Sequence, residues 1–261
     1  MRAPLFQLDA FTTRRFAGNP AAVVPLDRFL SDPDLQAIAA ENNLAESAFL
    51  VRDGSDYRLR WFTPTTEVPL CGHATLASGA VVLERLEPTR DRVVFHTASG
   101  PLMVARQGAK YVMDFPARPS QRVPTTERIR TALGADPFEV YADEFNYLVL
   151  LADANAVREL APDFAAIGRL DRGGLMVTAP GDGPFDFVSR YFAPAKGIPE
   201  DPVTGSAHCM LAPFWAPRLG KTELRAAQVS PRGGEVVCRV GSDRVELEGS
   251  CVFYLDGTIE I

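Results

Sequence analysis

The stretch Arg60-Trp61-Phe62-Thr63-Pro64 returns 130 residues later as Arg190-Tyr191-Phe192-Ala193-Pro194, in a chain of 261 residues. Two further pairs of similar segments flank it, in the same order along the chain. They are residues 33–38 with 162–167, and Cys71-Gly72-His73-Ala74 with Thr204-Gly205-Ser206-Ala207. Two copies are too few for a solenoid, so the duplication predicts two homologous lobes related by a pseudo-twofold axis. A pocket at the junction of two such lobes is the expected place for chemistry.

The composition is that of an ordinary globular protein, with 46% hydrophobic residues and a formal net charge of −6. Lys and Arg are scattered, which argues against nucleic acid as a partner, because binding phosphates requires clustered cations. No apolar stretch approaches the roughly 20 residues that span a bilayer, and the first residues lack the apolar core of a signal peptide. We therefore expect a cytoplasmic protein with no membrane partner, whose four cysteines are reduced.

Strand-like runs dominate both halves of the chain, and helices are few. One helix is expected to begin after Ser31 as N-cap and to end near Asn42. Two more begin at the glycine motifs, over residues 72–86 and from 205 to about 215, and are apolar on all sides, which is typical of buried helices. We predict an α+β fold with two pseudo-symmetric lobes, each a mostly antiparallel sheet or barrel around a central helix. The expected lobes are residues 1–117 and 118–261, with the last strand free to return to the first lobe.

Both of these buried helices begin directly after a loop rich in Gly, Pro and small polar residues. The start of a helix presents unpaired N–H donors and the positive end of its dipole, which together attract anions. Two such starts at one cavity would hold a substrate carboxylate and stabilise a developing enolate. The alternative is structural, with Thr204, Ser206 and the glycines simply capping their helices.

Several residues that could carry chemistry lie near these helix starts: His73, Asp201, Ser206, His208 and Cys71. A zinc site from Cys71, His73, His208 and Cys209 has suitable ligand types, but its spacings do not match the usual zinc pairs. A Ser206 hydrolase triad is disfavoured as well, because residues 204–208 lack the GxSxG pattern. Proton transfer beside a carboxylate-binding pocket is the interpretation that we favour.

The two motifs differ at the position where a symmetric two-base enzyme would carry matched bases. Cys71 is matched by Thr204, which is not a base, so a symmetric thiol pair is absent. The asymmetry favours a single base that removes and returns a proton, which is isomerisation rather than inversion.

An ordered set of motifs gives the chain a resemblance to a known family. The motifs are Asp9-Ala10-Phe11-Thr12, Phe16-Ala17-Gly18-Asn19-Pro20, residues 44–49, Phe62-Thr63-Pro64, residues 71–75, residues 201–208 and residues 230–234. This set resembles the phenazine-biosynthesis PhzF-like family, relatives of diaminopimelate epimerase. The resemblance implies the two-lobed diaminopimelate epimerase-like fold, usually as a homodimer, with no metal and no organic cofactor. The founding member of the family is an isomerase that acts on trans-2,3-dihydro-3-hydroxyanthranilate.

The resemblance also implies roles for individual residues. Glu46 takes the place of the acid/base glutamate of the family, with its pKa raised if it lies beside a buried pocket. His73 and Asp201 correspond to the histidine and the acidic residue of the two motifs. Contacts to the substrate carboxylate fall on Gly72, Gly205 and Ser206. Cys71 departs from the pattern of the founding isomerase and resembles the first thiol of the epimerases.

We therefore predict a cofactor-independent isomerase that moves a proton within a small carboxylate-bearing metabolite, with Glu46 as the single base. His73 and Asp201 would position the substrate, and Cys71 and His208 are accessory candidates. One alternative is a two-base amino-acid epimerase or racemase that uses Cys71 with Glu46. Another is a non-catalytic metabolite-binding protein, which the fold alone does not exclude.

Overall fold

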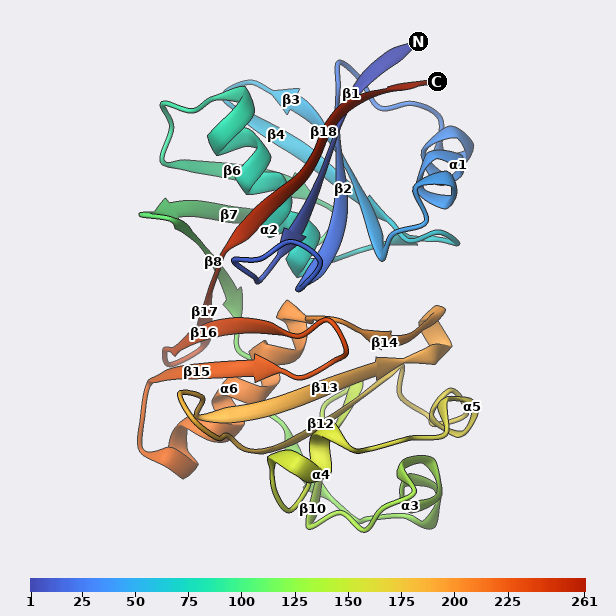
Figure 1. The fold of residues 1–261 in the computed structure, drawn as a ribbon, viewed down its shortest axis with the longest axis vertical. Helices are drawn as coiled ribbons and strands as arrows, with labels where there is room; N and C mark the ends of the chain where they lie inside the picture. Colours follow the sequence, from blue (N-terminus) through green and yellow to red (C-terminus); the bar gives the residue numbers. More distant parts are fainter. The chain divides into compact units, whose positions relative to one another are not determined.

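The computed structural model describes residues 1–261, which form two compact units. Unit 1 contains Met1–Asp114 and Glu248–Ile261, and unit 2 contains Phe115–Leu247. The chain passes between the units within β8 (Lys110–Pro116) and within β17 (Arg244–Gly249). The last strand, β18 (Cys251–Glu260), therefore lies in the same unit as the N-terminus. Figure 1 shows the two chain ends side by side in unit 1, where the Ile261 amide donates to the Met1 carbonyl.

Unit 1 is built mainly from antiparallel strand pairs. In addition to β8 and β18, its strands are β1 (Arg2–Ala10), β2 (Asn19–Leu26), β3 (Glu46–Asp53), β4 (Asp56–Phe62), β5 (Glu67–Val68), β6 (Arg92–Thr97) and β7 (Gly100–Gln107). The pairs β18–β1, β1–β2, β3–β4, β4–β5, β6–β7 and β7–β8 are antiparallel, whereas β2–β3 and β4–β6 are parallel. Each parallel pair needs a crossover connection, and a helix supplies it in both cases.

The two crossover helices of unit 1 begin where the sequence predicts. Helix α1 (Asp32–Asn42) has Ser31 as its N-cap, whose hydroxyl accepts from the Asp34 amide, and proline in its first turn. Helix α2 (Gly72–Val81) continues as one π-helical turn (Val82–Leu86) to the expected end. All ten residues of α2 are buried, and it contacts β1, β2, β3, β7 and β18. This helix is therefore the central helix of unit 1.

Unit 2 repeats the pairing pattern of unit 1. In addition to β17, its strands are β9 (Gln121–Val123), β10 (Glu139–Ala142), β11 (Asn146–Leu150), β12 (Gly174–Pro180), β13 (Phe187–Ala193), β14 (Ile198–Asp201), β15 (Glu223–Gln228) and β16 (Gly234–Val240). The parallel pairs are β11–β12 and β13–β15, and antiparallel pairs link β9–β10, β10–β11, β12–β13, β13–β14 and β15–β16. The pairings from β1 to β7 thus recur in the same order from β10 to β16, as the sequence duplication predicts.

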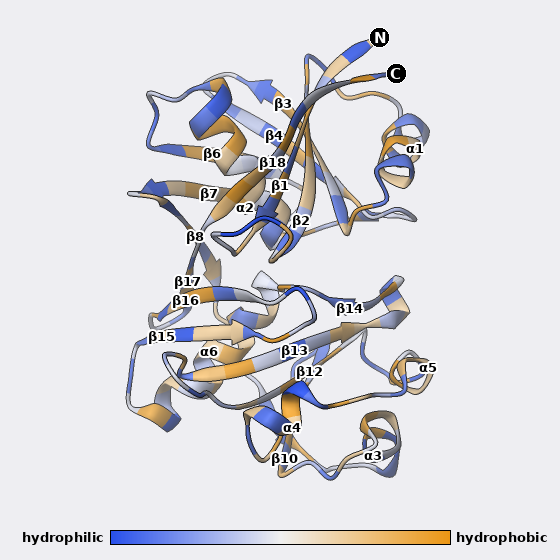
Figure 2. Cartoon of the chain, in the orientation of Figure 1, coloured by the Kyte–Doolittle hydropathy of each residue, from blue (hydrophilic) through white to orange (hydrophobic).

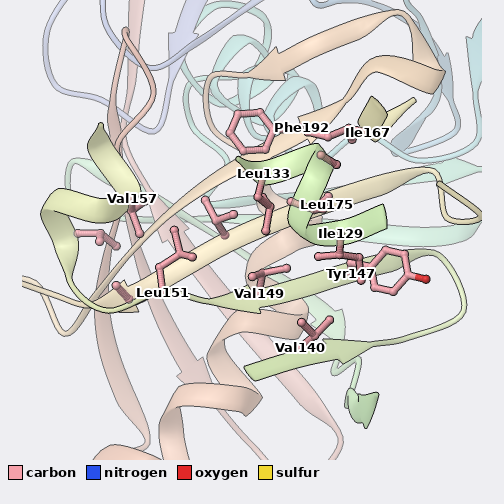
Figure 3. Close-up of a cluster of buried hydrophobic side chains, with 14 of the residues drawn as sticks. Ile129, Leu133, Val140, Tyr147, Val149, Leu151, Val157, Ile167, Leu175 and Phe192 are labelled. Carbon is pink, nitrogen blue, oxygen red and sulfur yellow. The ribbon is translucent and has the colours of Figure 1, made fainter. Parts of the chain in front are cut away.

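Three short helices of unit 2 cover one side of its strands. They are α3 (Glu127–Leu133), α4 (Ala154–Arg158) and α5 (Phe164–Ile167), capped by Thr126, Asp153 and Asp163 respectively. Figure 3 shows Ile129 and Leu133 of α3 pointing toward strand residues such as Val149 and Leu175. Figure 2 shows hydrophobic and hydrophilic residues along the helices and strands of both units. Burying this apolar surface is the main force that holds the helices on the sheet.

The central helix of unit 2, α6 (Gly205–Leu219), runs four residues beyond the predicted end near Trp215. It contains Pro213 and Pro217. A proline inside a helix leaves the carbonyl four residues earlier without its usual amide donor. For Pro213 that carbonyl belongs to Cys209, and it accepts instead from the Arg118 amide at 2.9 Å. An amide from outside the helix therefore offsets the bond that the proline removes.

The duplication also appears in matched side-chain contacts. Arg60 pairs with Glu67 in unit 1, and its counterpart Arg190 pairs with Glu200 in unit 2. Thr75 donates to the carbonyl of Cys71, and at the matched position His208 contacts the carbonyl of Thr204. The resemblance between the two halves therefore extends from sequence to side-chain contacts.

The predicted α+β fold, with a mostly antiparallel sheet around a central helix in each unit, is confirmed. The sequence reading missed β18, whose residues are exposed over much of their length and show no clear alternation. The short β9 was not expected either. None of the helices is both long and apolar enough to span a membrane.

Candidate active site

Glu46 and His73 form a buried pair in unit 1. Glu46 is the first residue of β3, and His73 is the second residue of α2. Their side chains are only 9% and 3% exposed, and Oε2 of Glu46 lies 3.2 Å from Nε2 of His73. The start of β3 and the start of the central helix thus bring together two residues that are 27 positions apart in the chain.

The other ring nitrogen of His73 faces Asn19 and Cys71. The Asn19 side-chain amide nitrogen lies 3.0 Å from Nδ1, and the Cys71 sulfur lies 3.5 Å from the same atom. Which group donates in these contacts depends on which ring nitrogen carries the hydrogen. The ring of His73 is therefore held between Asn19 and Cys71 on one side and Glu46 on the other.

Burial keeps His73 uncharged at neutral pH. Loss of hydration lowers the pKa of His73 to about 3, against the weaker opposing effect of a hydrogen bond to the Pro20 carbonyl. The imidazole beside Glu46 is thus neutral and does not cancel a charge on the neighbouring carboxylate.

The central helices begin at Gly72 and Gly205, as the motifs predict. Their N-caps are Cys71 and Thr204, and neither side chain makes a capping hydrogen bond. The capping alternative therefore fails for the Thr204 hydroxyl, which donates to the Asp201 carboxylate instead. Ser206 follows Gly205 in the first turn of α6 and is half-buried.

Asp201 is held in place by a buried glutamine that the sequence reading overlooked. Asp201 ends β14, and its main-chain carbonyl accepts from the Gln228 side-chain amide at 2.7 Å. The same side chain accepts from the Thr204 amide at 2.8 Å and contacts the Thr204 hydroxyl at 3.2 Å. Gln228 is 1% exposed, so one side-chain amide replaces the backbone partners that this loop would otherwise lack.

The accessory candidate His208 has a structural contact in α6. Its Nδ1 lies 2.8 Å from the Thr204 carbonyl, and burial lowers its pKa to about 4. A neutral His208 donates from Nδ1 to that carbonyl. This contact does not match a hydrolase triad, in which the corresponding nitrogen donates to a carboxylate.

The predicted site residues thus form two groups, one in each unit. Glu46, Cys71 and His73 offer ligand-type atoms that all lie within 4.8 Å of one another in unit 1. Asp201, Gly205, Ser206 and His208 lie on one strand end and helix start of unit 2. Asn19 belongs to the group in unit 1 through its contact with His73, and Gln228 belongs to the group in unit 2 through its hydrogen bonds to Asp201 and Thr204. A sequence signal existed for Asn19, within the Phe16–Pro20 motif, but an isolated glutamine such as Gln228 gave none.

Comparison with known proteins gives the family of the chain. The sequence profile of the PhzC-PhzF family, described as "Phenazine biosynthesis-like protein", matches residues 8–257. The chain belongs to the PhzC-PhzF family. A protein of Pseudomonas aeruginosa named an uncharacterized isomerase is 49% identical over 261 residues, which cover all of both chains. The predicted resemblance is therefore confirmed.

Solved structures support the same assignment. A PhzF family protein from Enterococcus faecalis is 43% identical and superposes with a TM-score of 0.96 over the whole of both chains. A hydroxyproline epimerase from Agrobacterium vitis superposes with a TM-score of 0.62, covering 99% of this chain and 92% of that chain, at 10% identity. That likeness shows the shared epimerase-like fold. The PhzF-like chain is accordingly an enzyme of an isomerase family.

Proposed function

We propose that the enzyme moves a proton within a small carboxylate-bearing metabolite, with Glu46 as the single acid/base group. The reaction would be similar to that of trans-2,3-dihydro-3-hydroxyanthranilate isomerase. Membership of the PhzC-PhzF family and the isomerase relatives support the general class. The single observation that carries the assignment of Glu46 is its buried contact with His73.

The contact between Glu46 and His73 supports different roles for the two side chains. Nε2 of His73 lies 3.2 Å from Oε2 of Glu46, in a buried site where the ring is neutral. We assign proton removal and return to the Glu46 carboxylate, because the lowered pKa of His73, about 3, makes its ring a poor proton acceptor at neutral pH. Asn19, 3.0 Å from Nδ1, would help to hold the ring in position. His73 is then an orienting group, and Glu46 carries the substrate proton.

The residues of unit 2 are assigned to substrate binding as predictions. The first-turn amides at Gly72 and Gly205, with the Ser206 hydroxyl, would hold the carboxylate. Asp201 would contact an amine or hydroxyl of the substrate, with Gln228 holding its main chain in position. These roles rest on family motifs and on the lack of capping side chains at both helix starts.

Replacing Glu46 by Gln tests the proposal. The variant is expected to lose substrate-dependent deuterium uptake from D₂O, by a factor of at least about 10² for a lost general base. Trans-2,3-dihydro-3-hydroxyanthranilate and a panel of cyclic and amino-acid carboxylates would serve as substrates. Glu41→Gln, the same change on an exposed residue of α1, is the matched control. Unchanged exchange in Glu46→Gln, with the thermal melt also unchanged, would exclude the role.

One observation favours a second function, an epimerase that uses Cys71 with Glu46. The two groups contact opposite nitrogens of His73, with Cys71 sulfur at 3.5 Å from Nδ1 and Glu46 at 3.2 Å from Nε2. An epimerase would need both groups as bases. The unmodified enzyme would then form products of inverted chirality, and Cys71→Ser would abolish exchange. Tight binding of a ligand without exchange of any hydrogen would instead support a metabolite-binding protein.

A further inference from the structure

Glu46, Cys71 and His73 combine the three side-chain types that most often bind zinc. A carboxylate, a thiol and an imidazole, all buried, bring their ligand-type atoms within 4.8 Å of one another. Thiolate and imidazole ligands select borderline or soft metals over magnesium and calcium. Three protein ligands with a fourth position for water or substrate is also the usual pattern of an open zinc site.

Two distances in the cluster have the size that tetrahedral coordination requires, one at each ring nitrogen of His73. With Zn–S and Zn–N bonds of about 2.3 and 2.05 Å, tetrahedral geometry places sulfur and nitrogen about 3.6 Å apart. The Cys71 sulfur lies 3.5 Å from Nδ1 of His73. Nitrogen and carboxylate oxygen on the same ion would be about 3.4 Å apart, and Nε2 of His73 lies 3.2 Å from Glu46. A single ion can use only one ring nitrogen, so either Cys71 or Glu46 must shift.

All three ligands are provided by elements of unit 1. Cys71 and His73 flank the first residue of α2, and Glu46 begins β3, which α2 contacts. Their positions are therefore set by the packing of the central helix on the sheet. Binding would release the thiol proton, and the thiolate and carboxylate charges would together balance a divalent cation.

We propose that Glu46, Cys71 and His73 bind one zinc-class divalent ion that inhibits the enzyme. The inhibition, but not the binding, rests on the proposed function, because the ion would occupy the carboxylate that is assigned to proton transfer. A metal on Glu46 also removes the contact between its carboxylate and the His73 ring. Free zinc would thus compete with the substrate for the same buried group.

Cobalt(II) is a suitable probe, because thiolate coordination gives it a sulfur-to-metal charge-transfer absorption. The full-length protein, freed of metals with a chelator, is titrated with CoCl₂ and then with ZnCl₂. One equivalent of cobalt per chain should produce the band, and zinc should abolish it. Cys71→Ser should lose the band, whereas Cys209→Ser, a cysteine of the first turns of α6 that contacts the Gly205 carbonyl, should keep it.

A second variant guards against misfolding of Cys71→Ser. Glu46→Gln keeps the thiol and should retain the band while its zinc affinity falls by at least about tenfold. No band in the original protein, or a band that persists in Cys71→Ser, would overturn the inference. Deuterium exchange by the metal-free enzyme separates the two proposals. If exchange is intact without metal and zinc does not bind, only this inference fails; if Glu46→Gln exchanges normally while cobalt binds, only the proposed function fails.

Discussion

Replacing Glu200 by Gln should destabilise the protein far more than the same change at Glu67. The two glutamates are repeat counterparts, each paired to an arginine through two contacts: Arg190 to Glu200 at 2.7 and 2.9 Å, and Arg60 to Glu67 at 2.8 and 2.7 Å. The side chains of the first pair are 9% and 13% exposed, and those of the second pair are 24% and 42% exposed. Residue type and the two contact distances are thus matched, whereas burial differs, and Arg60 also pairs with Asp32 at 2.8 Å.

The magnitude follows from that difference in burial. Removing one partner of a buried ion pair costs about 3–5 kcal/mol, because the other charge is left without compensation. Arg190 also donates to the carbonyls of Val157, Arg158 and Leu160, which would hold part of its charge. We therefore expect a somewhat smaller cost, about 2–4 kcal/mol, for Glu200→Gln. Glu67→Gln should cost about 0.2–1 kcal/mol, as for exposed pairs.

Urea denaturation of the two variants measures the difference. With a slope of about 3 kcal/mol per M, Glu200→Gln should lower the midpoint by about 1 M and Glu67→Gln by less than about 0.3 M. Glu200 directly precedes Asp201 on β14, so its loss should also weaken catalysis if Asp201 binds the substrate. Equal midpoint shifts in the two variants would refute the argument that burial sets the energy of the pair.

Three further predictions concern single side chains. The lowered pKa of His208, about 4, means that the unfolded chain takes up its proton first as the pH falls, so the contribution of His208 to stability is complete above pH 6.5 and falls by up to about 3 kcal/mol toward pH 4; melts of His208→Asn should show a shallower acid dependence. Gln228→Ala leaves the Asp201 carbonyl without its donor and should cost about 1–3 kcal/mol, with a higher KM for the substrate, whereas Gln228→Asn should recover little because its side chain is shorter. In Gly79→Ala the new Cβ would lie 2.4 Å from the Val104 side chain, a clash of about 1–3 kcal/mol that the additional change Val104→Ala should relieve in a thermal melt.

The repeated motifs were predictable from sequence because each places several residues in a fixed local order. The N-cap at Ser31 and the helix starts at Gly72 and Gly205 follow from short-range rules and appear where expected. The end of α6 was misjudged, because a local rule for proline does not include the Arg118 amide, which comes from a distant part of the chain. Strand β18 lacked a signal since its side chains are largely exposed, and its pairing with β1 joins opposite ends of the sequence.

In the site, too, some features could be predicted from sequence and others depend on contacts between distant segments. His73 and Asp201 were candidates because they lie near the helix starts, whereas Glu46 came from family motifs, since a glutamate before a strand is otherwise unremarkable surface. The contacts of His73 with Asn19, Cys71 and Glu46 depend on how the start of α2 packs against β2 and β3. No periodicity encodes the role of Gln228, because its partners lie 24 and 27 residues earlier in the chain.

By itself, the sequence determined the duplication, the α+β class, the positions of the two central helices and the family. Those properties depend on local patterns and on the order of motifs, which are present in the chain before it folds. Only the tertiary structure decided the uncharged state of His73, the fixing of Asp201 by Gln228, and which arginine–glutamate pair is buried. Each of these depends on burial and on distances of a few ångströms between segments far apart in sequence, and such distances exist only once the strands have paired around their helix.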